Sequence, residues 1–171
     1  MAETIVMIHG MWGSGNYWGD FKGFFESKGY RCMTPTLRYH DMDPKGVPDP
    51  RLRTTSLLDY AEDLEKLIRE LDGIPILMGF SMGGLLAQIL GSRGLARVLV
   101  LLSPAPPYGI NVLKLSVAIN FRSALMRGGF WRKPFRLAFA AVAHAMLNRM
   151  PLESPAGKKS QSISKSGSIK P

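Results

Sequence analysis

The sequence predicts an α/β fold, with a mostly parallel sheet, helices on both faces and a following helical segment that adds no strand. Short apolar runs alternate with stretches of helical periodicity up to residue 105. These runs are apolar at nearly every position, which is typical of strands buried on both faces. Glycine-rich turns follow two of the runs, at the sheet edge where parallel strands present their carboxyl ends.

The first expected element is a strand that leads into a glycine-rich loop. Residues 4–8 form a β-branched, apolar run that ends at His9. The loop Gly10–Gly15 comes next. Residues 17–28 then carry tryptophan and phenylalanine at helical spacing, and Gly29 ends this predicted helix.

A second strand, a long loop and the clearest helix of the chain follow. Residues 30–34 are expected to form the strand, and the proline- and glycine-rich residues 35–54 an irregular surface loop. Residues 56–71 place apolar side chains on one face and charged side chains on the others, as an amphipathic helix does. Ser56 and Asp59 have the spacing of a cap at the start of this helix.

The last two predicted strands flank a third helix. Residues 74–80 and 97–102 are apolar runs, and residues 82–92 between them have helical character. Beyond residue 104 no further strand is expected, because residues 112–127 and 133–150 show helical spacing instead.

The chain is long enough for one domain with a substantial apolar core. We expect this domain to span residues 1–150, with its core in 4–105 and a helical segment in 106–150. Residues 151–171 are rich in serine and lysine and lack the apolar content that folding needs, so they predict a disordered tail.

A serine lies between two glycines where the third strand is expected to become the third helix. The stretch ILMGFSMGGLLAQILG contains Gly-x-Ser-x-Gly around Ser81, which is the pattern of a nucleophile elbow. Glycines two residues on either side leave room for a tight turn that exposes the serine hydroxyl. The following helix N-terminus favours an oxyanion, and the backbone N–H of Met82 is one expected donor. The alternative is a strand–turn–helix crossover whose serine has no function.

A second motif lies at the end of the first strand. With VMIHGMWGSGNYW there and ILMGFSMGG later, residues 4–105 resemble the serine esterase, lipase and amidase branch of the α/β-hydrolase superfamily. The resemblance implies a partial α/β-hydrolase fold and hydrolysis of a small carboxylic ester, thioester or amide. It also implies a second oxyanion donor in the N–H of Met11, a structural role for His9 and a lid-like role for residues 106–150.

The base and acid that a serine nucleophile needs are not evident. In this family the acid follows the serine, and the histidine follows the acid. After Ser81 the chain has one histidine, His144, and one acid, Glu153, in the reverse order. His144 is therefore either the base or an ordinary residue of an apolar helix, and Glu153 lies in the predicted tail. His40 precedes the serine in a loop and matches no family position.

The missing partners predict a chain shortened at its C-terminus. A deletion or a change of reading frame near residue 150 would replace the later strands of the family and explain the abrupt change of composition. A truncated homologue without activity, or a binding module, is then the alternative to a working hydrolase. A sheet that lacks its later strands also leaves one edge uncovered, which raises the prospect of self-association.

Charge and motifs restrict the partners and cofactors. The net charge is +9, but residues 1–110 hold 11 Lys and Arg against 12 Asp and Glu, whereas residues 111–171 hold 11 against one. Binding of nucleic acid or anionic lipid by the basic half is an alternative to a lid without acidic partners. We favour the lid and expect no nucleic-acid partner. No metal-ligand cluster or nucleotide-binding glycine motif occurs, so no metal or cofactor is expected.

The remaining expectations concern substrate and location. Trp12 and Phe80 lie near the two loops and are expected to contact an apolar part of a small-molecule substrate. No apolar run approaches the roughly 20 residues of a membrane span, and the N-terminus lacks the pattern of a secretory signal. Cys32 is the one cysteine, which indicates a reducing, cytoplasmic setting.

Overall fold

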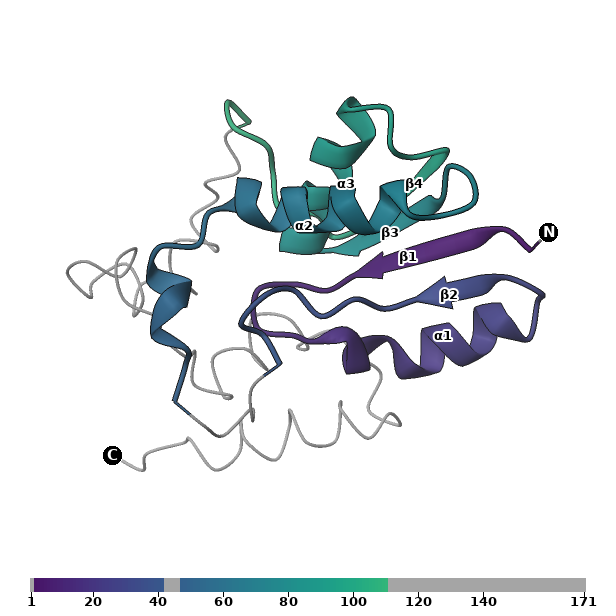
Figure 1. The fold of residues 1–171 in the computed structure, drawn as a ribbon, viewed down its shortest axis with the longest axis horizontal. Coiled ribbons are helices and arrows are strands. Elements are labelled where there is room, and N and C mark those ends of the chain that lie inside the picture. Colours follow the sequence, from purple (N-terminus) through teal and green to yellow (C-terminus); the bar gives the residue numbers. More distant parts are fainter. Residues whose placement is uncertain (1, 42–46, 111–171) are drawn as a thin grey trace, which may run out of the picture. The chain divides into compact units, whose positions relative to one another are not determined.

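The computed structural model describes residues 2–41 and 47–110 of the chain, and its strands and helices alternate in the predicted order (Figure 1). The elements are β1 Thr4–Ile8, η1 Gly15–Trp18, α1 Gly19–Glu26, β2 Arg31–Met33, η2 Pro50–Arg53, α2 Leu57–Arg69, β3 Ile76–Phe80, α3 Met82–Ser92 and β4 Val98–Leu102. The η elements are short 3-10 helices, so the predicted helix 17–28 begins as a 3-10 turn. The predicted loop 35–54 also contains one of them.

The four strands form a parallel sheet in the order β2-β1-β3-β4, which confirms the expected fold class. Helix α1 covers one face, and α2 and α3 cover the other (Figure 1). In the register of the two central strands, Ile8 pairs with Gly79. The loop after β1 and the turn after β3 therefore leave the sheet side by side, at its carboxyl edge.

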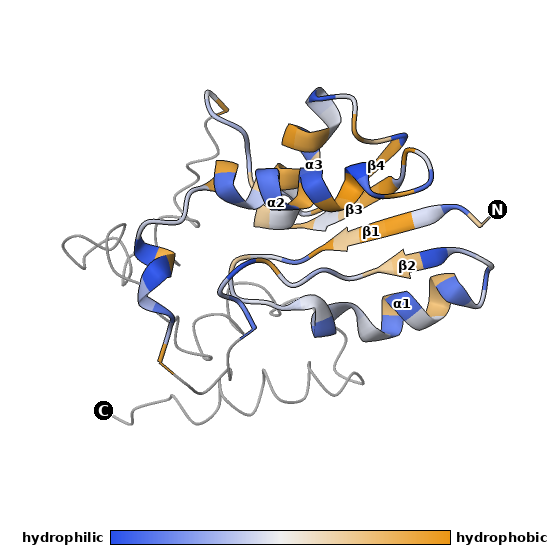
Figure 2. Ribbon diagram, in the orientation of Figure 1, coloured by the Kyte–Doolittle hydropathy of each residue, from blue (hydrophilic) through white to orange (hydrophobic). Residues whose placement is uncertain are grey.

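Two apolar clusters hold the helices on the sheet, because successive strand residues point to opposite faces. Val6 and Ile8 pack in the cluster that includes α2 and α3, whereas Ile5 and Met7 pack with Trp18 in the other. Figure 2 shows the same pattern, with hydrophobic residues concentrated in the strands between the helical layers.

Strand β4 is one of the two outer strands of the sheet in the described part of the chain, at the edge opposite β2. Three of its five residues keep 36–47% of their surface exposed, namely Val98, Leu99 and Leu101. An apolar edge of this kind can pair with another strand. Self-association through this edge stays a prediction.

Helix α2 begins with the cap that the sequence predicts. The Ser56 hydroxyl accepts from the Asp59 N–H at 3.2 Å, and the Asp59 carboxylate accepts from the Ser56 N–H at 2.6 Å. The two side chains thus satisfy N–H groups that the helix cannot satisfy itself.

Replacing Ser56 by alanine is expected to lower the free energy of unfolding by about 1 kcal/mol, because one capping bond is lost. Urea denaturation followed by circular dichroism measures this change. Ser92→Ala is the matched control, since the Ser92 hydroxyl donates only to the Ile89 carbonyl at the end of α3. An equal loss in both variants would contradict the role of the cap.

The predicted helices 112–127 and 133–150 and the predicted tail 151–171 lie outside the described residues. Within the described ranges, no helix is long and apolar enough to cross a membrane. The same ranges contain no group of three His, Cys, Asp or Glu side chains placed to hold a metal ion.

Candidate active site

Ser81 occupies a strained turn between β3 and α3. Its φ of 53° and ψ of −117° lie in a region that non-glycine residues rarely adopt. Backbone hydrogen bonds hold it there: the Ser81 N–H donates to the Leu102 carbonyl at 3.2 Å, and the Ser81 carbonyl accepts from the N–H groups of Gly84 and Ala105 at 3.0 and 2.8 Å. The surrounding structure therefore maintains a backbone conformation that serine alone does not favour.

The glycines around Ser81 allow three backbone segments to meet. A side-chain carbon added to Gly83 would overlap the Ile8 carbonyl oxygen and lie 2.6 Å from that of His9. One added to Gly79 would lie 2.6 Å from the nitrogen of Gly84. Only glycine leaves room for the N-terminus of α3 against the ends of β1 and β3.

The Gly10–Gly15 loop touches the serine. A side-chain carbon on Gly10 would lie 3.3 Å from the Ser81 Cβ and 3.3 Å from the Phe80 ring. The loop then turns, with the Gly13 N–H donating to the Gly10 carbonyl at 3.0 Å. Met11 lies inside this turn, so its N–H belongs to the segment that borders Ser81.

His9 is fully buried beneath this loop, and both of its ring nitrogens are engaged. Nε2 accepts from the Leu37 N–H at 3.0 Å, so the proton lies on Nδ1, which donates to the Gly10 carbonyl at 2.7 Å. Burial, opposed by the hydrogen bond to Gly10 and aided by a smaller effect of the nearby His40, lowers the pKa of His9 to about 4. A neutral imidazole with both nitrogens hydrogen-bonded suits the structural role expected for His9. It leaves no nitrogen free to accept a proton from Ser81.

The His9 site predicts a stability that depends on pH. The pKa of His9 falls from an ordinary value of 6.5 in the unfolded chain to about 4 in the fold, so between these values the unfolded chain binds more protons. Stability is thus fully present above pH 6.5 and is lost as the pH falls toward 4, by on the order of 2–3 kcal/mol.

Urea denaturation at pH 7.5, 6.5, 5.5 and 4.5 measures this loss. Burial also lowers the pKa of His40, which adds to the loss below pH 6.5, whereas carboxylates with a lowered pKa, such as Glu65 beside Arg69 and Arg93, weaken the fold only below their ordinary value of 4.5. A free energy of unfolding that stays constant from pH 6.5 to 5 would contradict the assignment.

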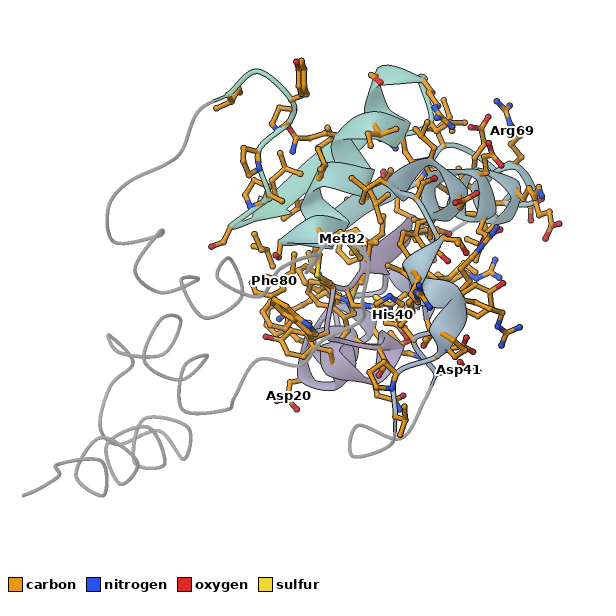
Figure 3. The ribbon with its side chains drawn as sticks, turned by 90° about the vertical axis from the view of Figure 1, so that its left-hand side faces the viewer. Asp20, His40, Asp41, Arg69, Phe80 and Met82 are labelled. Atoms are coloured by element: carbon orange, nitrogen blue, oxygen red, sulfur yellow. The ribbon has the colours of Figure 1, made fainter. Side chains whose placement is uncertain are left out.

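His40 also lies at this edge, although the sequence assigns it no role. Its ring centroid lies 5.2 Å from that of His9, and its Nε2 lies 3.2 Å from the Tyr60 hydroxyl. Figure 3 views the carboxyl edge end-on, with Phe80, Met82 and His40 near its centre. Among contacts between described residues, neither imidazole bonds to Ser81. The available signal was the place of His40 just beyond the second strand, whose carboxyl end reaches this edge.

The other predicted site residues are distributed as follows. Phe80 is half-buried and stacks on Tyr17, with ring centroids 5.8 Å apart, and Trp12 is 47% exposed on the loop. Met82 is buried as the first residue of α3. His144 lies outside the described residues.

Residues 5–162 match the sequence model of the Alpha/beta hydrolase family. The chain belongs to this family. The match confirms the family resemblance that the two motifs indicate. A comparison with curated protein sequences gives no significant match.

Solved structures of α/β hydrolases share the fold. The thioesterase domain from the curacin biosynthetic pathway is 23% identical, with a TM-score of 0.56, and the match covers 96% of this chain and 58% of that one. An extracellular α/β-hydrolase from a Paenibacillus species is 23% identical, with a TM-score of 0.51 and coverage of 61% and 42%. The pyrethroid hydrolase PytH is 24% identical, with a TM-score of 0.50 and coverage of 61% and 41%. This α/β hydrolase thus spans about half the length of the structures it matches.

Proposed function

We propose that this chain is a serine hydrolase with Ser81 as its nucleophile, acting on a small carboxylic ester, thioester or amide. The observation that carries the proposal is the backbone of Ser81, with φ 53° and ψ −117° at the junction of β3 and α3. Glycine would adopt this conformation without strain, whereas serine adds a hydroxyl at the sheet edge. Strain of this kind clusters at functional sites, since a structure must maintain it.

The oxyanion hole is proposed to consist of two backbone N–H groups. Met82 is the first residue of α3, so its N–H is free of helical bonding and lies at the positive end of the helix dipole. The N–H of Met11 comes from the loop that borders Ser81. Attack of the Ser81 Oγ on the substrate carbonyl gives a tetrahedral oxyanion that these donors stabilise. Loss of the alcohol, thiol or amine leaves an acyl-serine, which water then hydrolyses.

The general base of the proposed reaction is sought among the histidines of the chain. The chain has three histidines; His9 bonds to the Gly10 carbonyl and the Leu37 N–H, and His40 bonds to the Tyr60 hydroxyl on α2. His144 is the remaining histidine and is our candidate base. No acid is assigned, so the triad is incomplete on this chain.

The substrate is proposed to be a small molecule with an apolar portion against Trp12 and Phe80. Structural neighbours named as a thioesterase domain and a pyrethroid hydrolase suit this substrate class. A domain over 1–150 with a lid-like segment in 106–150 and a tail in 151–171 belongs to the same proposal. So does a cytoplasmic setting, on the single cysteine of the chain, which is buried.

A catalytically inactive homologue or binding module is the second candidate. The observation that favours it is that the described histidines bond to groups other than Ser81: His9 to the Gly10 carbonyl and the Leu37 N–H, and His40 to the Tyr60 hydroxyl on α2. Such a protein would keep the elbow as architecture and bind a ligand without converting it.

Hydrolysis of p-nitrophenyl acetate by the full chain separates the two candidates. We expect turnover that Ser81→Ala abolishes and that Ser92→Ala, at an exposed serine of α3, leaves unchanged. His144→Ala is expected to reduce the rate as strongly as Ser81→Ala, because His144 is the proposed base. Equal rates in the parent protein and in folded Ser81→Ala would contradict the proposed reaction and favour the binding module.

A further inference from the structure

The segment Leu37–His40 braces the buried His9 from two directions. The Leu37 N–H donates to the His9 Nε2, and the His40 ring lies against the His9 ring, tilted by 53°. The segment is itself a closed turn, because the His40 N–H donates to the Leu37 carbonyl at 3.0 Å. Tyr39 within it has a φ of 64°, which a non-glycine residue rarely adopts. The chain thus holds a strained turn that places an imidazole beside His9.

The other contacts of His40 connect the glycine-rich loop to α2. Its ring is hydrogen-bonded to the Gly13 backbone, and its Nε2 lies 3.2 Å from the hydroxyl of the buried Tyr60 on α2. Gly13 in turn donates to the Gly10 carbonyl, which His9 also contacts. The Gly10–Gly13 turn is therefore held by both imidazoles, and the Met11 N–H lies within that turn.

We infer that His40 is a positioning residue for the oxyanion hole, acting through His9 and the Gly13 backbone on the N–H of Met11. The inference rests on the proposed function, because it assigns the Met11 N–H to the reaction. A histidine that served only to fill the core would not need hydrogen bonds to both α2 and the loop backbone. His40 is not a catalytic residue in this proposal, since its contacts lead to the loop and not to Ser81.

The environment of His40 keeps the imidazole neutral. Burial lowers its pKa, while the hydrogen bond to Gly13 and the charge of Asp41 act in the opposite direction. The titratable groups that face the ring are His9, Tyr60 and Asp41. A neutral ring both donates and accepts, as its two polar neighbours require.

Two substitutions of His40 in the full chain test the inference. His40→Phe keeps an aromatic ring of similar size but removes its hydrogen bonds, whereas His40→Gln retains a donor and an acceptor. Tyr30→Phe is the control, because it alters a tyrosine just before β2 that packs on Phe25, on the other face of the sheet. Deuterium uptake by residues 10–15 and the kcat and KM for p-nitrophenyl acetate are measured for each protein.

We expect His40→Phe to raise uptake by the loop at least several-fold and to lower kcat about 10- to 100-fold, with KM within twofold. One oxyanion donor is worth roughly 10²–10³ in kcat, and a loosened donor loses part of that. His40→Gln is expected to bring loop uptake and kcat most of the way back to the parent values. Tyr30→Phe is expected to change neither uptake nor kcat.

Two results would overturn the inference. One is a folded His40→Phe protein whose loop exchange and kcat match the parent. The other is a loosened loop with kcat intact, which would make His40 merely structural. If the parent protein shows no turnover, the proposed function fails, and deuterium exchange alone tests the contact of His40 with the loop. An increase in uptake by His40→Phe that is confined to residues 10–15 supports the positioning of the loop by His40. Uptake equal to that of the parent contradicts it.

Discussion

Ser81→Gly is expected to make the protein more stable and to end its hydrolytic activity. Serine at φ 53° and ψ −117° carries a strain that glycine lacks, so the free energy of unfolding should rise by about 1 kcal/mol. Turnover should fall by at least about 10³-fold, because the attacking oxygen is removed. Stability rises while activity falls because, in the proposed function, the strained backbone presents the attacking hydroxyl.

Urea denaturation and ester hydrolysis of Ser81→Gly and Ser81→Ala measure the two effects separately. Alanine removes the hydroxyl but keeps the strained backbone, so Ser81→Ala should lose activity without gaining stability. A Ser81→Gly protein that is no more stable than Ser81→Ala would show that the turn carries no strain. A Ser81→Gly protein that retains turnover would show that the reaction occurs elsewhere.

Gly83→Ala is expected to be the most damaging small substitution in the described part of the chain. The added carbon would overlap the Ile8 carbonyl oxygen and lie 2.6 Å from the His9 carbonyl oxygen. Both neighbours are backbone atoms at the end of β1, so they cannot move aside as a flexible side chain can. Relief requires α3 to move away from the sheet, at a cost of roughly 3 kcal/mol or more.

The matched control for Gly83→Ala is Gly23→Ala. Gly23 lies in α1, and beyond its chain neighbours and the backbone of its own helix no atom lies within 4 Å of an added side-chain carbon, so alanine should stabilise that helix by roughly 0.5–1 kcal/mol. Chemical denaturation of both variants gives the comparison. A Gly83→Ala protein within about 1 kcal/mol of the parent would contradict the close packing of α3 on β1.

The sequence predicts most of the elements because their signals are local. Apolar runs, the Ser56–Asp59 cap and the glycines around Ser81 each depend on residues close together in the chain, and the structure contains the expected strands, cap and turn. The strand ends also bring the loop Gly10–Gly15 to Ser81, as parallel topology requires.

The bracing of the site could not be predicted in the same way. His40 contacts His9 and Tyr60, which lie 31 and 20 positions away in the sequence, and no local pattern specifies such pairs. The left-handed conformation of Tyr39 could not be predicted either, because no neighbouring residue in the sequence indicates a positive φ at this position. These features arise from tertiary packing, which overrides local propensity.

Neither the local sequence patterns nor the tertiary contacts of the described residues identify an acid and a base for the proposed reaction. The described residues include the proposed nucleophile and the proposed oxyanion donors, whereas His144 and Glu153 lie outside the described residues. The matches cover 42%, 41% and 58% of these neighbouring structures, so each neighbour contains segments that the match does not reach. The question whether Ser81 reacts is therefore tested by a chemical reaction of the full chain.

Covalent labelling answers that question directly. The full chain is incubated with a fluorophosphonate, which phosphonylates serines that an adjacent base and oxyanion hole activate. Intact mass and peptide mapping then locate the label. The proposed function predicts one added phosphonyl group on Ser81, with none in Ser81→Ala and full labelling in Ser92→Ala. An unmodified mass in a folded sample, or a label on another residue, would show that Ser81 is not the nucleophile of this α/β hydrolase.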